Sequence, residues 1–324
     1  MKKTFAFAAA AGMALALMAG PVSAQTFPNQ PVRVISPFPA GSGPDAVARI
    51  VGEKLAVTLK QPIVIDPRPG ANGFLAANAV KAAAPTGYDL FLADIGHLTI
   101  NPSLFKKLPY DAKTDFVPVS GVYRASFFIA VGANSPIKTL KDLIAAAAVP
   151  GRVTYGSNAI GSPLHLGAAQ VEAATNTKML HVPFKEISQL YAAVSTGEVD
   201  WALGSIASAG PLLRAGKLRF LAIADTSRSP AMPDVPTFEQ AGGPGPLSAN
   251  SWVSLVAPKG TPAAVVTTLN RGINDALKQP DVVEKLAGFG FTPFTGSPAD
   301  LVKVIDSDTI RNAALVKRTG ASVE

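Results

Sequence analysis

Short runs rich in β-branched residues alternate along this chain with longer segments of helical periodicity. The first two β-rich runs along the chain predict strands at residues 32–36 and 63–66, and the segment between them predicts a helix at residues 45–59. The helix gathers its apolar residues on one stripe and its charged residues elsewhere, which is the pattern of a helix that packs on a sheet. This order of elements predicts parallel strands covered by helices.

The middle of the chain continues the alternation. Strands are expected at residues 153–155, 178–182 and 200–203, with helices at 164–174 and 187–196 between them. Because each helix lies between two strands, these residues are predicted to form a second α/β unit.

Two further apolar runs, residues 127–131 and 251–256, are predicted to carry the chain between the two units. We therefore expect a two-lobed α/β protein with a mostly parallel sheet flanked by helices in each lobe. Lobe 1 would contain residues 25–126 and 249–324, and lobe 2 the inserted residues 127–248. Closure of the lobes is expected to occur by a hinge at the two crossovers.

The N-terminus has the composition of a secretory signal. Lys2 and Lys3 precede an apolar run at residues 5–18, which is shorter than the ~20 residues that a membrane-spanning helix needs. Cleavage is expected after Ala24, so that residues 1–24 are a signal peptide and the mature chain is periplasmic. Since the chain has no Cys, a lipid anchor at the new N-terminus, disulfides and thiolate chemistry are all excluded.

Charge and composition exclude several other classes. The formal net charge of +7 falls to about +5 once Lys2 and Lys3 are removed, and the remaining cations are scattered. A nucleic-acid surface is therefore not expected. The three histidines lack the spacing of helical metal ligands, and no G-x-S-x-G motif occurs, so neither a metal site nor that class of hydrolase is predicted. A catalytic triad assembled from distant residues stays an alternative.

Two loops have the features of anion-binding sites. The first loop, residues 37–45, and the second loop, residues 155–165, are rich in Gly and Ser, and each lies between a strand and a helix N-terminus. Exposed amides and the positive end of the helix dipole favour a carboxylate there. With one loop in each lobe, both at strand ends, we expect them to face a single cleft.

The first loop also imitates a dinucleotide-binding fingerprint. Gly41, Gly43 and Ala46 follow a strand, and Asp66 closes the next one. Against this interpretation, four residues separate the strand from Gly41, and Pro44 removes an N–H near the expected phosphate position. No cofactor is therefore predicted.

Long ordered stretches of the chain match one known family. They include PVRVISPFPAGSGPDAVAR, VTYGSNAIGSPLHLGA and AGKLRFLAIADTSRSPAMPDVPTFEQAG. Through them nearly the whole mature chain resembles the Bug family, the periplasmic solute-binding proteins of tripartite tricarboxylate transporters. The resemblance implies a type II, Venus-flytrap binding protein that holds the carboxylate of its ligand with loop amides from both lobes. It also implies membrane permease subunits as partners; the protein itself is expected to be a monomer.

The resemblance also assigns candidate site residues by position. The chain departs from the family pattern at Pro44 in the first loop and at Glu186. It also has Gly204 and Ser205 where many members carry an acidic or amide pair. Ser205 is nevertheless a candidate donor for a distal ligand oxygen. Whether His97 and Glu186 contact the ligand stays open. The candidate contacts from the resemblance are Phe38, Pro39, Ala40, Ser42, Asn72, Gly73, Ser157, Asn158, Gly161, Ser162, His165 and Phe184.

These departures also bear on the class of ligand. An ammonium group would lack an anionic partner at Gly204 and Ser205, unless Glu186 supplies one, and burying it unpaired would be costly. The sequence therefore favours an aromatic or short aliphatic mono- or dicarboxylate, and narrowly a dicarboxylate, since each loop could receive one end. The alternative function is a periplasmic enzyme that acts on a carboxylate or an ester.

Overall fold

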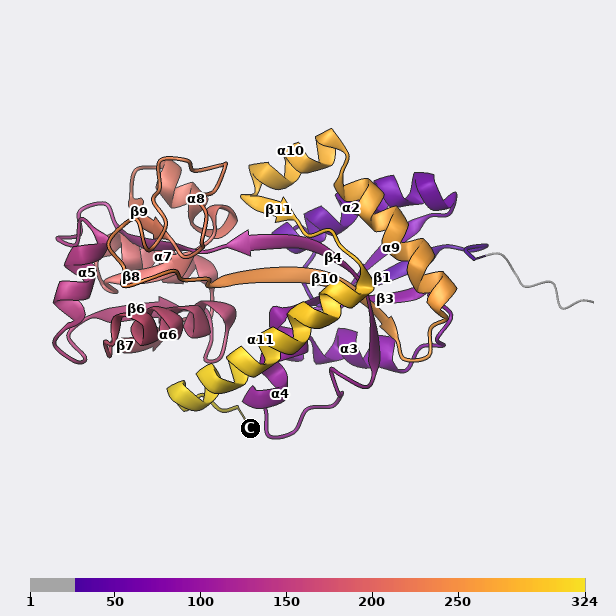
Figure 1. Cartoon of the computed structure of the whole chain (residues 1–324), viewed down its shortest axis with the longest axis horizontal. Coiled ribbons are helices and arrows are strands. Elements are labelled where there is room, and N and C mark those ends of the chain that lie inside the picture. Colours follow the sequence, from indigo (N-terminus) through magenta and orange to yellow (C-terminus); the bar gives the residue numbers. More distant parts are fainter. Residues whose placement is uncertain (1–26, 324) are drawn as a thin grey trace, which may run out of the picture.

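The computed structural model describes residues 27–323, and the predicted signal peptide lies outside these described residues. The chain forms two lobes, each built on one β-sheet with helices packed against it (Figure 1). This confirms the two-lobed α/β architecture predicted from the sequence. No helix within residues 27–323 is long and apolar enough to span a lipid bilayer.

Lobe 1 is built on a six-stranded sheet. Its strands, in spatial order, are β11 (Phe291–Pro293), β4 (Phe116–Ser126), β10 (Asn250–Pro258), β3 (Asp89–Asp94), β1 (Val32–Ser36) and β2 (Ile63–Pro67). β1 pairs in parallel with β2 and β3, whereas β10 runs antiparallel to both β3 and β4. The carboxyl ends of β1 and β3 therefore lie at the same edge of the sheet.

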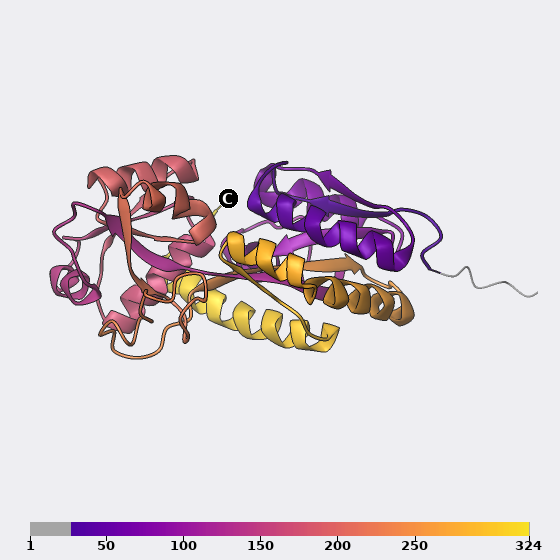
Figure 2. The same cartoon turned by 90° about the horizontal axis from the view of Figure 1, so that it is seen from above.

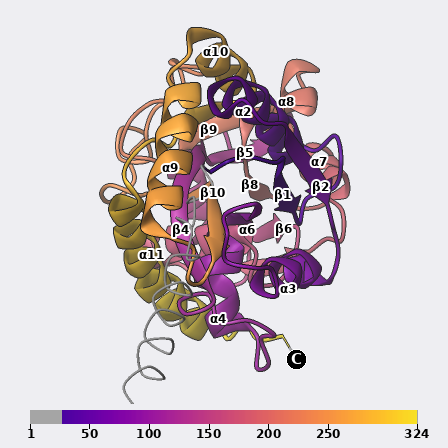
Figure 3. The same cartoon turned by 90° about the vertical axis from the view of Figure 1, so that its right-hand side faces the viewer.

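Helices cover both faces of the lobe 1 sheet. Because successive strand residues point to opposite faces, Val34 of β1 packs on one side of the sheet and Ile35 on the other. The two layers of helices are visible from the end of lobe 1 (Figure 3). The first layer contains α2 (Gly43–Leu59), α9 (Ala263–Leu277) and α10 (Pro280–Gly288), and the second contains α3 (Phe74–Lys81) and α11 (Pro298–Thr319).

Three short helical turns complete lobe 1. A 3-10 turn, η1 (Ala71–Gly73), precedes α3, and a π-helical turn, η2 (Gly96–Ile100), leads from the end of β3 directly into α4 (Asn101–Leu104). π-Helical turns are rare and occur frequently at functional sites. The end of β3 is therefore a candidate position for ligand-binding side chains.

Lobe 2 is built on a five-stranded sheet, and its buried core includes Trp201 and Tyr191. Figure 2 shows this lobe beside lobe 1, seen from above. In spatial order its strands are β7 (Leu180–Pro183), β6 (Thr154–Ser157), β8 (Trp201–Gly204), β5 (Phe128–Gly132) and β9 (Leu218–Ile223). Its helices are α5 (Leu140–Ala147), α6 (Pro163–Thr175), α7 (Ile187–Thr196) and α8 (Ile206–Arg214).

Both sheets are more mixed than the expectation of mostly parallel strands. β5 pairs antiparallel with β8 and β9, just as β10 does with its two neighbours in lobe 1. The reason is the way in which the chain changes lobes. It leaves lobe 1 through β4 and returns through β10, and the two strands lie side by side in opposite directions.

The two connections between the lobes lie next to each other. Asn250, the first residue of β10, pairs with Ser126, the last residue of β4. Beside them, the Ala224 N–H donates to the Phe127 carbonyl at 2.7 Å, and the Ala249 N–H donates to the Ala224 carbonyl at 2.9 Å. The predicted crossover runs are both strands, and the chain changes lobe at the N-terminal end of each.

The lobes also share apolar contacts away from these connections. Leu166 and Ala169 of α6 belong to the same buried cluster as Leu104 and Trp252 of lobe 1. Helix α6 therefore anchors one side of lobe 2 against lobe 1.

Candidate ligand-binding site

The first loop is held in shape by hydrogen bonds within itself. Gly41 has a φ of 78°, and its N–H donates to Asp45 Oδ2 at 2.9 Å. The Ser42 hydroxyl donates to the Pro39 carbonyl at 2.7 Å and caps α2 by accepting from the Asp45 N–H at 3.5 Å. Burial alone would raise the pKa of Asp45, but Arg49 and the Gly41 N–H bind the carboxylate and lower that pKa overall. Asp45 therefore supports the loop as an anion.

The second loop has the same construction with a different closing residue. Gly161 has a φ of 74°, and its N–H donates to His165 Nδ1 at 2.9 Å. Ser162 caps α6 by accepting from the His165 N–H at 3.2 Å. The His165 ring stacks on His181 with centroids 3.9 Å apart, and burial lowers the pKa of each imidazole to about 4. Both rings are therefore neutral at pH 7.

These internal bonds decide which amides can meet a ligand. The N–H groups of Gly41, Ser42, Gly161 and Ser162 are used within the loops. Within residues 27–323, by contrast, the amides of Ala40, Gly43 and Asn158 donate to no other group. A carboxylate between the loops could therefore receive hydrogen bonds from both lobes.

A cleft of about 370 Å³ lies between the lobes beside these loops. Of the predicted site residues, Phe38, Asn158 and Ser205 line it. The remaining lining residues come from both lobes and from the connecting strands: Gly43, Pro44, Asp94, Tyr123, Ala125, Phe127, Pro163, Leu164, Ile187, Ala207, Ser208, Ser251, Val253 and Phe291.

Other predicted residues do not line the cleft. Gly161 is buried against lobe 1, where an added Cβ would lie 2.4 Å from the Leu104 side chain. Gly73 leaves room for His97, since a Cβ there would lie 2.1 Å from His97 Nε2. His165 lines a separate cavity of about 550 Å³ near the end of α11. Pro39, Ala40, Ser42, Asn72, Ser162 and Phe184 also lie outside the lining of the cleft.

Ser157 and His181 form a side-chain pair that the sequence did not reveal. The Ser157 Oγ lies 2.7 Å from His181 Nε2 and donates its proton to the Ala159 carbonyl at 2.8 Å. Ser157 has no exposed surface. Its hydroxyl proton is therefore committed to the loop, and this pair stabilises the second loop rather than presenting a nucleophile.

Sequence reasoning missed Asp94, the last residue of β3. Its side chain is 19% exposed and is the one charged group among the described residues that line the cleft. Oδ1 accepts from the His97 N–H at 3.0 Å and faces His97 Nδ1. Burial would raise the pKa of Asp94, but the charge and hydrogen bonds of His97 and the Gly96 N–H lower it overall. The premise that the cleft lacks an anion was therefore wrong.

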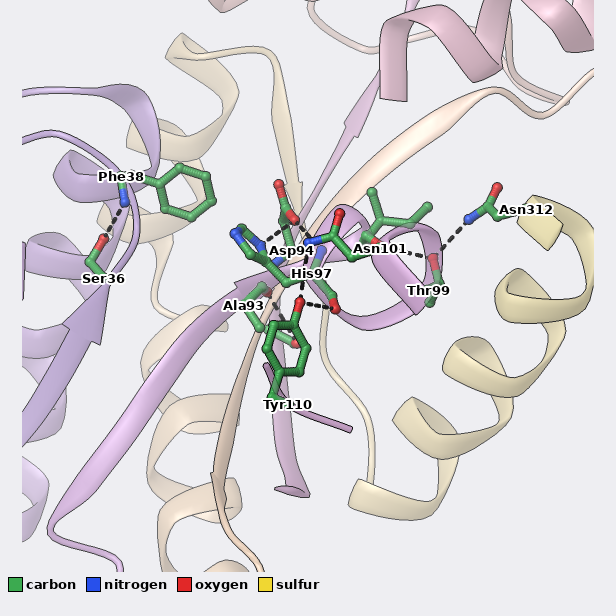
Figure 4. A network of polar contacts seen from close by, with 11 residues as sticks. Ser36, Phe38, Ala93, Asp94, His97, Thr99, Asn101, Tyr110 and Asn312 are labelled. Atoms are coloured by element: carbon green, nitrogen blue, oxygen red, sulfur yellow. Dashed lines mark hydrogen bonds and ion pairs between the residues drawn. The ribbon is translucent and has the colours of Figure 1, made fainter. Parts of the chain in front are cut away.

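A network of hydrogen bonds holds Asp94 and His97 in place (Figure 4). The Tyr110 hydroxyl donates to the His97 carbonyl at 2.7 Å and accepts from Asn101 Nδ2 at 3.1 Å. Asn312 of α11 donates to Thr99 Oγ1 at 2.7 Å and so ties the other end of η2 to the lobe 1 core. The position of the Asp94 carboxylate is thus set by elements far apart in the sequence.

Comparisons with known proteins agree on one family. Residues 47–321 match the family described as the tripartite tricarboxylate transporter family receptor. BugT of Bordetella pertussis is 34% identical over 314 residues, which cover 96% of this chain and 96% of BugT. Rpa4515 of R. palustris, solved with adipate, is 30% identical with a TM-score of 0.80, covering 91% of this chain and 99% of that one. MatC of Rhodopseudomonas palustris, solved with bound malate, is 32% identical with a TM-score of 0.76, covering 90% and 100%.

Proposed function

Because this chain belongs to the tripartite tricarboxylate transporter receptor family, we propose that it captures a small carboxylate and delivers it to the permease subunits of such a transporter. The observation that carries the proposal is the pair of matching loops, one from each lobe, with unused amides beside a cleft of about 370 Å³. The adipate and malate bound to the two related structures support a carboxylate as the ligand class.

In this proposal the ligand carboxylate lies between the two loops. The amides of Ala40, Gly43 and Asn158 supply the hydrogen bonds, and the dipoles of α2 and α6 add favourable potential. Phe38 and Phe291 form apolar walls for the remainder of the ligand. In this proposal the protein is also a periplasmic monomer that binds its ligand without turnover and requires no cofactor.

Delivery requires that the cleft opens and closes. We propose that lobe 1 (residues 25–126 and 249–324) and lobe 2 (residues 127–248) rotate about the paired connections at Phe127 and Ala249. These connections are short and adjacent, which is the geometry of a two-strand hinge. Identical small-angle scattering curves with and without saturating ligand would contradict closure.

The test of the proposed function is a binding screen on the mature protein. A panel of mono-, di- and amino-carboxylates is scanned by thermal shift, and hits are measured by calorimetry with product analysis of the same samples. We expect stoichiometric binding of at least one carboxylate, unchanged ligand after incubation, and a melting temperature that rises with ligand concentration. The proposal fails if no carboxylate binds or if the ligand is converted.

A further inference from the structure

The balance of charge in the cleft does not suit a plain dicarboxylate. Asp94 is the sole ionised side chain among the described residues that line the cleft. Arg49, at the first loop, is already engaged by Asp45, with Nε 2.9 Å from Oδ2. The guanidinium of Arg124 in β4 lies 3.8 Å from the centre of the Phe294 ring. Neither Arg49 nor Arg124 lines the cleft. A ligand with two carboxylates would therefore face the Asp94 carboxylate, and the side chain that pairs with Asp94, His97, does not line the cleft.

One oxygen of Asp94 is open toward a ligand. His97 engages Oδ1 through its N–H and its ring, and the Gly96 N–H also faces the carboxylate, whereas Oδ2 receives no hydrogen bond from any side chain in the described range 27–323. Figure 4 shows one carboxylate oxygen within the dashed contacts and the other outside them. A largely buried carboxylate oxygen without a side-chain partner favours a ligand that brings a donor, most strongly a charged one.

The surroundings of this oxygen make it selective. Tyr123 also lines the cleft, stacked on Phe291 with ring centroids 4.3 Å apart, and no hydrogen bond of its hydroxyl to a described residue is present. Phe38 packs edge-on against His97 at 6.0 Å. Aromatic faces beside a carboxylate also suit a cationic nitrogen, which rings attract through their quadrupole.

We propose that Asp94 Oδ2 binds a protonated nitrogen of the ligand, so that this protein selects carboxylates that also carry an ammonium group. This inference rests on the proposed function, since the two loops hold the ligand carboxylate while Asp94 receives the opposite charge. It reverses the narrow preference for a dicarboxylate drawn from the sequence. Glu186, the other candidate partner for an ammonium group, is exposed at the start of α7 and does not line the cleft.

The test compares ligands of matched skeleton on matched variants. Calorimetry measures aspartate against succinate, glutamate against glutarate, and 4-aminobutyrate against butyrate. The proteins are the wild type, Asp94→Asn, which keeps the shape and removes the charge, and Glu186→Gln, which removes a charge outside the cleft. Asp94→Ser is a second uncharged variant, and thermal unfolding confirms that each is folded.

In the wild type and in Glu186→Gln we expect at least one amino-carboxylate to bind about tenfold or more tightly than its plain partner, as for a charge-assisted contact. In both Asp94 variants this preference should fall to within about threefold. Tighter binding of the plain acids by the wild type, or a preference that survives in both Asp94 variants, overturns the inference while leaving the proposed function standing. Absence of binding by every carboxylate of the wider panel overturns the proposed function and the inference with it.

Discussion

The first and second loops share one backbone design and differ in the residue that closes it. In each, a glycine with positive φ donates its N–H to a side chain four residues later, and a serine caps the following helix. The closing residue is the anion Asp45 in the first loop and the neutral His165 in the second. Asp45 and His165 are both buried, but their partners differ, because Asp45 is paired with the exposed Arg49, whereas His165 stacks on the His181 ring.

This difference shows that the geometry of an anion-binding loop does not require one charge state. A carboxylate and a neutral imidazole both accept the glycine N–H, so each fixes the turn and leaves other amides free. The two loops should therefore respond alike to changes in the turn and differently to changes in packing and pH.

The largest expected contrast comes from the two glycines. Gly41→Ala and Gly161→Ala both place a Cβ at positive φ, which costs about 1 kcal/mol or somewhat more. A Cβ at Gly41 meets nothing within 4 Å, whereas at Gly161 it lies 2.4 Å from Leu104 of lobe 1. We expect urea unfolding to show a further loss of about 1–3 kcal/mol for Gly161→Ala alone, as for overpacking. Equal losses in the two variants would show that Leu104 moves aside freely.

The second contrast is in pH dependence. His165 and His181 have pKa values near 4 in the folded protein and 6.5 as the reference for the unfolded chain. The unfolded chain therefore takes up protons first, and the free energy of unfolding falls as the pH drops from about 6.5 toward 4. Asp45 has a lowered pKa, so its contribution is lost only below this window.

For the buried His165 this loss amounts to about 1–2 kcal/mol at pH 5, since one pKa unit corresponds to about 1.4 kcal/mol. Urea unfolding at pH 7, 6 and 5 measures it, with His165→Gln as the comparison. The variant should lose less stability on acidification than the wild type. An identical pH slope in both proteins would place the titrating group elsewhere.

Much of the fold could be predicted from local sequence because helix starts and apolar stripes are local signals. The helix expected at residues 187–196 is α7, and the strand expected at residues 32–36 is β1. β4 was not predicted, because Pro118 and Gly121 argue against a central strand. In the structure the strand is irregular in its pairing with β10, and Gly121 lies where a Cβ would meet Phe294 at 2.4 Å.

The candidate site divides in the same way. Both loops could be found because glycine, serine and proline at a strand-to-helix junction are a local pattern. Asp94 could not be recognised as a cleft residue, because its position depends on β3 pairing with β1 and on the π-helical turn that follows. A usable signal was present, since an acidic residue ends a strand that neighbours the first loop. The hydrogen bonds that the Gly41 and Gly161 amides donate within their own loops could not be predicted either, because they depend on the folded shape of each turn.

The smallest expected effect concerns the two capping serines. Ser42→Ala and Ser162→Ala each remove the acceptor that begins a helix, which costs about 1 kcal/mol of stability. Ser42→Ala should cost slightly more, since its hydroxyl also donates to the Pro39 carbonyl.

Ser297→Ala at the start of α11 is the matched control, because Ser297 caps its helix in the same way and lies outside the cleft. All three variants should lose similar stability in urea, but only Ser42→Ala and Ser162→Ala should weaken ligand binding in calorimetry, because only these loops present amides to the cleft. Equal weakening by Ser297→Ala would mean that affinity follows overall stability and not the shape of the loops.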